Sequence, residues 1–470
     1  MESAPGTAKP RVPRRGELLD LEIDSLAFGG RGVARAGGLV VFVAGALPGD
    51  RVRAEVTKAK KRFAEARAVE VVRASEERLP DTCTHGGEPC PGAPLQGLAY
   101  ERQLAYKQEQ VDDALRRIGG LDGFETEPIV PAVEEWRYRN KLEYSFGESD
   151  EELALGFHAR GRWDLIVDVD DCHLGSVTGN EARNAVREWA REESIPAFDR
   201  RAGRGVLRNL AVREGRRTGQ IQTRLVTVKA RFPRPPVDLH TIVEGESGGS
   251  DGPTGVLGAE RLREELCGLK LEMSHGAFFQ TNTEMAERLY AVAAEFAGLS
   301  GRERVFDLFC GIGTIGLTMA GQAGEVWGLE IVPEAIADAE RNARRNKIGN
   351  AHFMAANART GVRPLVEKAG KPDVVVIDPP RAGLSQKIVR RVLECEAEKI
   401  VYVSCNPTTL APNAAQLGEA GYKLARVRPV DMFPQTPHIE CVALFERQAA
   451  RRGAAPAPAG EGPAGEGGDA

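Results

Sequence analysis

The sequence has no apolar run that approaches the roughly 18 residues a helix needs to span a membrane. Residues 1–15 are rich in proline and arginine and contain no apolar stretch of the kind found in a secretory signal peptide. These absences argue against a membrane-spanning or exported protein. They predict a cytoplasmic chain that makes no membrane contact.

A disulfide framework and a net positive charge are also lacking. Eight cysteines in 470 residues do not indicate the cross-linked core of a small secreted protein. The net charge of −5 argues against a nucleic-acid binder that is basic throughout. Residues 1–75, however, carry 14 Lys and Arg against 9 Asp and Glu, so they sum to +5 and the remainder to −10. A basic N-terminal module fits a partner with phosphates, and it fits a solvated charged face equally well.

Short alternating segments dominate the N-terminal region. Apolar and polar residues alternate over 19–23, 39–43 and 51–56, with glycine-containing turns between them. This spacing predicts a small OB-like β-barrel over residues 14–75. A basic run at 58–62 falls between two of the strands, where it is well placed to meet a backbone phosphate.

The middle of the chain reads as a second β-rich unit. Residues 83–98 are rich in Cys, Gly and Pro and predict a loop without regular pairing, whereas 99–118 have helical spacing. Strand-like alternation returns from about 137 to 245, and 245–258 predict a flexible loop. We therefore expect a β-rich central domain over 76–283.

Strands and helices alternate in the last part of the chain. This alternation predicts a Rossmann-like doubly wound sheet over residues 284–448, with a ligand at the carboxyl ends of its strands. The Pro-, Ala-, Gly- and Glu-rich segment 449–470 predicts a disordered tail.

A glycine-rich turn follows the first of these strands. The run Asp307-Leu-Phe-Cys-Gly-Ile-Gly-Thr-Ile-Gly316 fits GxGxxG, which is also the dinucleotide fingerprint. Glu330 ends the next strand, where a carboxylate can bind two ribose hydroxyls. Asp307 favours a cofactor with ammonium and sulfonium cations over a pyrophosphate. An NAD-dependent oxidoreductase remains the alternative that takes the glycines at face value.

Two later segments carry a carboxylate and a thiol. Asp378-Pro-Pro-Arg-Ala-Gly383 ends an apolar strand, and Cys405 ends the next strand at the same edge. Glu440 follows 35 residues after the cysteine, also after a strand-like segment. Thiolate addition at carbon 6 of uracil makes carbon 5 nucleophilic enough to take a methyl group, and a base must then remove the carbon 5 proton. Cys405 is the candidate nucleophile and Glu440 the candidate base, with His438 as the competing base.

With these residues in view, the chain resembles the RNA uracil-C5 methyltransferase family from about Gly16 to Glu446. Family motifs are matched in order by Phe278-Phe-Gln280-Thr-Asn282, Asp307-Leu-Phe309-Cys-Gly-Ile-Gly, Asp378-Pro-Pro-Arg-Ala-Gly, Ser404-Cys405-Asn-Pro and His438-Ile-Glu440. The N-terminal barrel resembles a TRAM domain, an RNA-contacting module. The resemblance implies an α/β methyltransferase fold that uses S-adenosylmethionine.

The same resemblance implies roles for individual residues. Cys405 is the expected nucleophile and Glu440 the expected base. The segment 139–141 resembles a stretch with possible substrate contact. Expected contacts of S-adenosylmethionine are Gln280, Phe309, Glu330 and Asp378, with Asn357 and Thr314 as weaker additions.

One departure from the family concerns a four-cysteine iron–sulfur cluster that many members carry. Cys83, Cys90 and the distant Cys172 match its ligands, but the third cysteine position holds Ala93. A cubane cluster is held by four thiolates, and three remain. A vestigial loop, a three-iron cluster and a cluster with His85 as substitute ligand are open alternatives.

The sequence thus predicts a monomeric enzyme that forms 5-methyluridine in structured RNA. The TRAM-like domain favours 23S ribosomal RNA as the substrate, by analogy within the family, and transfer RNA is the alternative. A non-catalytic RNA-binding or assembly factor on a methyltransferase fold is the rival from another class. A complete cysteine–glutamate pair argues against it, because a binding module needs neither residue.

Overall fold

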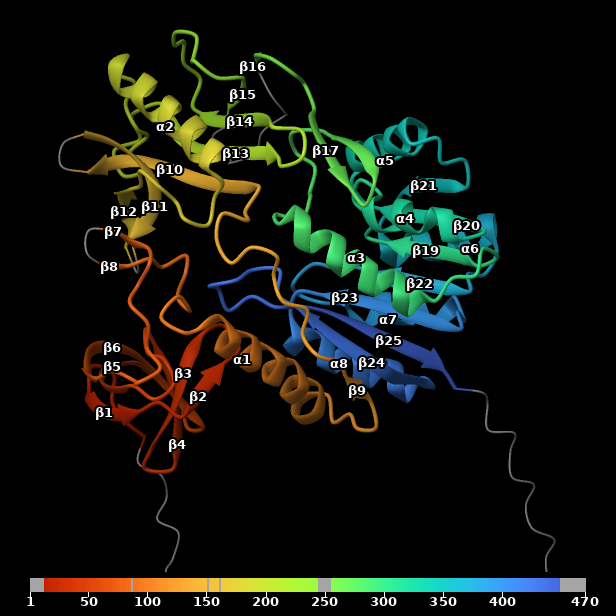
Figure 1. The fold of residues 1–470 in the computed structure, drawn as a ribbon, viewed down its shortest axis with the longest axis horizontal. Helices are drawn as coiled ribbons and strands as arrows, with labels where there is room; N and C mark the ends of the chain where they lie inside the picture. The colour runs from red at the N-terminus through yellow and green to blue at the C-terminus, as the bar shows by residue number, and fades with distance from the viewer. Residues whose placement is uncertain (1–11, 86–87, 150–151, 160–161, 244–254, 449–470) are drawn as a thin grey trace, which may run out of the picture.

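The computed structural model of the chain describes residues 12–85, 88–149, 152–159, 162–243 and 255–448. Three β-rich bodies follow one another along the chain, coloured red, yellow to green, and green to blue (Figure 1). The predicted disordered tail at 449–470 lies outside the described residues, as does most of the predicted loop at 245–258. No helix within the described ranges is long and apolar enough to cross a membrane.

The first body is a six-stranded sheet in the order β1-β5-β6-β4-β3-β2. Its strands are β1 (Leu18–Glu22), β2 (Ser25–Ala27), β3 (Arg31–Ala36), β4 (Leu39–Ala44), β5 (Arg51–Ala59) and β6 (Phe63–Arg73). β1 pairs with β5 at one end of this order, and β2 pairs with β3 at the other. Because two residues separate β1 from β2, one bent segment closes the sheet, which confirms the predicted small barrel. The predicted basic run at 58–62 spans the end of β5 and the exposed turn before β6.

A connecting segment joins this barrel to the rest of the chain. It contains a hairpin of two short strands, so the expectation that 83–98 lack regular pairing is wrong at this point. The predicted helix at 99–118 is present, and its last turn is π-helical. The elements are β7 (Thr84–His85), β8 (Glu88–Pro89), α1 (Tyr100–Asp113), its π-helical turn (Ala114–Ile118) and β9 (Glu125–Thr126).

The second body is a seven-stranded sheet in the order β12-β11-β10-β13-β14-β15-β16. Helix α2 packs on one face through Ala182, Val186 and Trp189, against Tyr144 and Leu210 among others. The elements are β10 (Lys141–Ser149), β11 (Glu152–Ala159), β12 (Arg162–Asp168), α2 (Val177–Glu192), β13 (Leu207–Gly215), β14 (Gln220–Thr227), β15 (Leu239–Val243) and β16 (Gly255–Val256). β16 pairs with β15, so the described end of the predicted 245–258 loop is a strand.

The third body is an eight-stranded sheet in the order β21-β20-β19-β22-β23-β25-β24-β9. Neighbours from β21 to β23 are parallel, whereas β25 runs antiparallel to both β23 and β24. The predicted doubly wound sheet is therefore present, and the antiparallel hairpin of β24 and β25, with the short strand β9 beside it, extends one side. Its strands are β19 (Arg304–Leu308), β20 (Glu325–Glu330), β21 (Ala351–Ala355), β22 (Val374–Ile377), β23 (Lys399–Ser404), β24 (Tyr422–Val430) and β25 (Glu440–Arg447).

Helices cover both faces of this sheet. One apolar core joins the strands to α3 (Thr283–Ala297), α4 (Thr314–Met319) and α5 (Pro333–Arg345), with the hairpin β17 (Leu262–Leu266) and β18 (Leu269–Met273) beside them. The other core joins them to α6 (Ala358–Ala369), α7 (Gln386–Glu394) and α8 (Pro407–Glu419). A short 3-10 turn, Ala320–Gln322, follows α4.

Helix α1 is fastened to the loop at 431–439, which connects β24 to β25. The Lys107 ammonium donates to Asp431 Oδ1 at 2.6 Å and to the Phe433 carbonyl at 3.1 Å. Both charged side chains are buried, with exposed fractions of 1% and 0%. Burial lowers the pKa of Lys107, and the Asp431 charge opposes that shift.

Replacing Lys107 with methionine leaves the Asp431 carboxylate buried without its cation. We expect Lys107→Met to lower the free energy of unfolding by about 3–5 kcal/mol, measured by thermal or urea denaturation. Arg102→Met is the matched control, because Arg102 lies on the same helix and its ion pair with Glu77 is exposed. The control should cost less than about 1 kcal/mol. Equal losses in the two variants would contradict a buried charge pair.

Candidate active site

A cavity of about 720 Å³ opens at the edge of the third sheet where its parallel strands end. It is lined by Arg139, Phe278, Gln280, Thr281, Phe309, Gly311, Leu329, Glu330, Ile331, Ala356, Asn357, Ala358, Asp378, Pro379, Pro380, Arg381, Ile388, Cys405, Phe433, His438 and Glu440. The structure therefore gathers all six predicted catalytic and cofactor-binding residues around one space. It also adds Arg139, Phe278 and Arg381, to which the motifs gave no catalytic or cofactor role.

The sheet topology brings the thiol and the carboxylates together. Asp378 follows β22 and Cys405 follows β23, and these two strands are parallel neighbours. Glu440 was expected to follow a strand, but it is the first residue of β25. β25 runs antiparallel to β23, with Cys441 opposite Ser404. A strand that runs antiparallel to β23 begins at the edge of the sheet where β23 ends. Glu440, as the first residue of β25, therefore lies at the same cavity as Cys405.

Burial perturbs the ionisable groups of the cavity in one direction. Desolvation, together with the charges of Glu440 and Asp378, raises the pKa of the Cys405 thiol to about 11, while Arg381 opposes the rise. Burial also raises the pKa of Asp378 to about 7 and that of Glu440 well above its usual range. Burial therefore shifts all three groups toward their neutral forms.

His438, the competing base, is affected in the opposite sense. Its burial lowers the pKa of its imidazole to about 4, and the cations Arg381, Arg139 and Lys107 add to the effect. The ring packs edge-on against Phe433 with centroids 5.9 Å apart. A lowered pKa makes the imidazole a weaker base, whereas a raised pKa makes the Glu440 carboxylate a stronger one. The electrostatics favour Glu440.

The glycine-rich turn after β19 adopts an unusual backbone beside the cavity. Phe309 has a φ of +66°, a conformation that costs a bulky residue of order 1–3 kcal/mol. The Phe309 amide donates to the Leu329 carbonyl at 2.8 Å, which helps to hold this geometry. Gly313 has a φ of +83° and begins α4, and a Cβ there would lie 3.0 Å from the Phe353 ring. The turn thus exposes backbone and the Phe309 ring to the cavity.

Glu330 lies at the end of β20 on the same side. Its Oε1 accepts from the Ile331 and Val332 amides at 2.7 and 3.0 Å, and its Oε2 accepts from the Gly311 amide at 3.3 Å. These amides orient the carboxylate at the wall of the cavity, as a carboxylate that binds paired hydroxyls requires.

Asp307 and Thr314, in contrast, are absent from the lining. Asp307 Oδ2 accepts from the Gly316 amide at 2.8 Å, so this side chain orders the start of α4. Thr314 Oγ1 lies 3.1 Å from the Tyr290 hydroxyl. Burial raises the pKa of Asp307 to about 7. An effect of Asp307 on a cationic ligand therefore acts through charge and not through contact, which corrects the simple interpretation of the motif.

The Gln280 segment is held by the central domain. The Asn140 side chain donates to the Gln280 carbonyl at 3.0 Å, and its backbone amide donates to the Thr281 carbonyl at 2.8 Å. Next to Gln280, the Phe278 ring is 68% exposed at the cavity wall. The sequence placed Phe278 in the same motif as Gln280, which was the only signal for it. An aromatic residue in a motif does not by itself indicate a function, so Phe278 was given no role.

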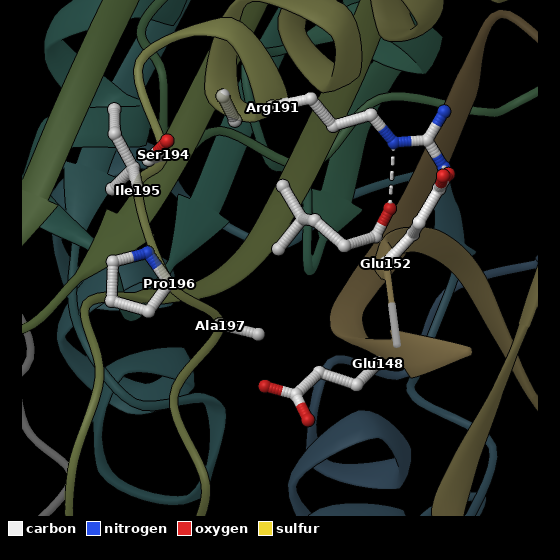
Figure 2. A pocket seen from close by; sticks show the side chains of 9 residues that line it. Glu148, Glu152, Arg191, Ser194, Ile195, Pro196 and Ala197 are labelled. Carbon is white, nitrogen blue, oxygen red and sulfur yellow. Dashed lines mark hydrogen bonds and ion pairs between the residues drawn. The ribbon is translucent and has the colours of Figure 1, made fainter. Parts of the chain in front are cut away.

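A second cavity of about 400 Å³ lies in the central domain, away from these residues. Figure 2 shows the Glu148, Glu152 and Arg191 side chains around it, beside the segment that follows α2. Arg191 Nε donates to the Leu153 carbonyl at 2.9 Å. Among its lining residues there is no thiol, histidine or predicted site residue, so the larger cavity is the candidate active site.

The three predicted metal cysteines lie outside both cavities. Cys83 and Cys90 are buried with Ala93, and Cys172 is buried in an adjoining cluster. Trp136 packs against both clusters. Ala93 contributes a methyl group where a four-thiolate cluster requires sulfur, so these residues do not fit the cluster typical of the family.

Comparisons with known proteins confirm the resemblance. A family model described as tRNA (uracil-5-)-methyltransferase matches residues 259–448, and a TRAM domain model matches 14–69. An uncharacterised RNA methyltransferase from Halalkalibacterium halodurans is 36% identical over 456 residues, covering 93% of this chain and 99% of the relative. Another from Porphyromonas gingivalis is 38% identical over 465 residues, covering 91% and 99%.

A solved structure is similar over nearly the same length. The Pyrococcus abyssi tRNA (uracil-54, C5)-methyltransferase, in complex with S-adenosyl-L-homocysteine, matches with a TM-score of 0.74 and 29% identity. The match covers 91% of this chain and all of that one. It confirms the predicted fold class.

The raised pKa of Cys405 predicts slow alkylation in the ligand-free protein. Because only the thiolate reacts, the rate with iodoacetamide should still rise about tenfold per pH unit from pH 7 to 10. The rate is read on the Cys405 peptide by mass spectrometry, with a cysteine in an unstructured peptide as the control. The control should level off above about pH 8.5. A Cys405 profile that levels off at the same pH as the control would contradict the desolvated surroundings of the thiol.

Proposed function

We propose that this chain works through a covalent bond between Cys405 and carbon 6 of a uridine. The chain belongs to the tRNA (uracil-5-)-methyltransferase family and is an S-adenosylmethionine-dependent RNA methyltransferase. The single observation that carries the proposal is that Cys405 and Glu440 line one cavity with the candidate cofactor residues. A binding module would need neither the thiol nor the buried carboxylate.

The chemistry explains why a nucleophile is needed. The Cys405 thiolate forms a bond to carbon 6, and the electron pair of the 5,6 double bond becomes an enolate that is nucleophilic at carbon 5. S-adenosylmethionine supplies an electrophilic methyl group, which carbon 5 takes. Glu440 then accepts the carbon 5 proton, the 5,6 double bond forms again and the thiolate leaves. The products are 5-methyluridine and S-adenosylhomocysteine.

The charges in the cavity set an order of binding. In the ligand-free protein the Cys405 thiol, with a pKa of about 11, is almost wholly protonated at neutral pH. A sulfonium cation in the same cavity favours the ionised forms of Cys405, Asp378 and Glu440. Cofactor binding therefore prepares the nucleophile and the base, and we expect it to precede RNA binding.

The cofactor side of the cavity is assigned on its contacts. Glu330, oriented by three backbone amides, binds the ribose hydroxyls. Phe309 offers its ring, and Asp378 accepts from a polar group of the cofactor. Gln280, positioned through Asn140, completes the set.

The RNA is bound over two parts of the chain. The target base turns out of its stack into the cavity, at a cost of about a few kcal/mol. Phosphate contacts at the exposed basic turn 58–62 of the barrel help to offset that cost. Monomeric state and cytoplasmic location stay predictions.

Two RNA classes remain as substrates. The TRAM-like domain in the sequence favours 23S ribosomal RNA as the substrate, and that assignment stays a prediction. The similar Pyrococcus abyssi structure, which is named for transfer RNA, supports the second candidate. Its match covers 91% of this chain, so overall fold does not separate the two classes.

The reaction and the RNA class are tested together. Wild-type protein and Cys405→Ala are incubated with tritiated S-adenosylmethionine and with unmethylated 23S ribosomal RNA or transfer RNA, and nucleosides are analysed. We expect label in 5-methyluridine from one pool, and a loss of more than about 10⁴-fold in the variant with cofactor binding intact. Substantial activity of Cys405→Ala would exclude the covalent route. If wild-type protein leaves no label in 5-methyluridine from either RNA pool, the assembly-factor function would be favoured.

The base is tested by a variant that keeps the first half of the reaction. In Glu440→Gln the amide cannot take the carbon 5 proton, so release should slow by about 10²–10⁴-fold. A protein–RNA adduct that resists denaturing gel electrophoresis should then accumulate. His438→Gln is the matched comparison, and it should form no such adduct. An adduct in His438→Gln alone would move the role of base to that residue.

A further inference from the structure

We propose that Cys83, His85, Cys90 and Cys172 bind a single zinc ion in place of an iron–sulfur cluster. The proposal concerns a site outside the active-site cavity and does not depend on the methylation chemistry. It rests on the positions of the donor atoms, on the amides that face the sulfurs, and on the residue that replaces the missing cysteine.

Three donor atoms already lie together. One ligand atom each from Cys83, His85 and Cys90 falls within 4.8 Å of the other two. Cys83 Sγ is 3.6 Å from His85 Nε2. Zinc bonds of about 2.3 Å to sulfur and 2.0–2.1 Å to nitrogen, at a tetrahedral angle, place the two ligands about 3.6 Å apart. The pair has the spacing of zinc ligands without any rearrangement.

Cys172 approaches the group from the central domain. It lies outside the three-atom group, but its charge acts on the Cys83 thiol, and that of Cys90 acts on Cys172. The backbone amide of the next residue, His173, faces the Cys83 sulfur. These interactions make Cys172 the candidate for the fourth ligand.

Backbone amides face each of the three sulfurs. The Gly92 amide lies beside the Cys90 sulfur and the Leu174 amide beside the Cys172 sulfur, whereas the Gly175 amide donates to the Cys172 carbonyl at 3.0 Å. With the His173 amide on Cys83, every sulfur has at least one N–H partner. Such donors stabilise the thiolate form that a metal requires, and they orient the sulfur.

The ligand set distinguishes zinc from an iron–sulfur cluster. Ala93 is fully buried against Cys83 and Cys90, so its methyl group occupies the place of the absent thiol. The nearby His85 offers nitrogen instead. Three thiolates and one imidazole are a frequent structural zinc set, and Zn²⁺ binds such a site more tightly than Fe²⁺.

The ion would join separate parts of the chain. Cys83, His85 and Cys90 belong to the connecting segment, whereas Cys172 precedes α2 of the central domain. The same connecting segment reaches the 431–439 loop, because the Leu95 amide donates to the Gln435 carbonyl at 3.0 Å. Zinc would therefore hold the connecting segment to the part of the central domain that precedes α2, next to the loop that leads to Glu440.

The first test is the metal content of the intact protein. The full chain is produced with both iron and zinc in the medium, purified without oxygen, and assayed for metals and acid-labile sulfide. We expect about one zinc per chain without labile sulfide, and a tetrahedral absorption spectrum after exchange with Co²⁺. Iron with labile sulfide would overturn the proposal, as would a protein that takes up no zinc.

Variants assign the ligands. His85→Ala should weaken zinc binding by more than about tenfold, measured by competition with a chromophoric chelator. Loss of a residue that only hydrogen-bonds to a metal ligand already lowers metal affinity by about that factor. Cys267→Ser is the matched control, because Cys267 is exposed and lies in the β17–β18 turn. Ala93→Cys should raise the content of iron and labile sulfide by restoring a fourth thiol. Unchanged zinc affinity in His85→Ala would overturn the assignment of that residue.

Discussion

The loop at 431–439 is the part of the molecule on which the active site depends most. The buried ion pair of Lys107 with Asp431 fixes its beginning, and paired amide contacts of Gln103 with Gln435 fix its middle at 2.8 and 3.0 Å. The Tyr138 hydroxyl adds a contact to the Pro434 carbonyl at 3.0 Å. Segments from three regions of the chain thus meet at this loop. Glu440 follows it directly, so its place at the cavity depends on contacts made far away in sequence.

Desolvation is the second constraint, and it opposes ionisation of the groups that line the cavity. Burial raises the pKa of Cys405, Asp378 and Glu440 together, which disfavours the ionised form of each group. The arrangement suits a cationic ligand, because a positive charge in surroundings of low dielectric acts strongly on its neighbours.

Much of the site was accessible from the sequence, because the chemistry lies at strand ends. In a parallel sheet, residues that follow successive strands meet at one edge, and this placed Asp378 next to Cys405 without any coordinates. Glu440 could be named from its motif, but its location could not be explained, because the antiparallel direction of β25 has no local signature. For Asp307 the sequence indicated the strand end beside the cavity but not the direction of the side chain. That side chain accepts from the Gly316 amide at the start of α4 and does not line the cavity.

The sequence by itself determined the order of the elements, the family motifs and the residue types at the cavity, because these depend on local periodicity and on spacing along the chain. Only the tertiary structure decided which side chains share a space and how burial shifts their protonation. It also placed His85 beside Cys83 and Cys90, while Ala93 fills the position of the absent thiol. Distances across the fold and the removal of water arise from packing between distant segments, and no pattern within one segment encodes them.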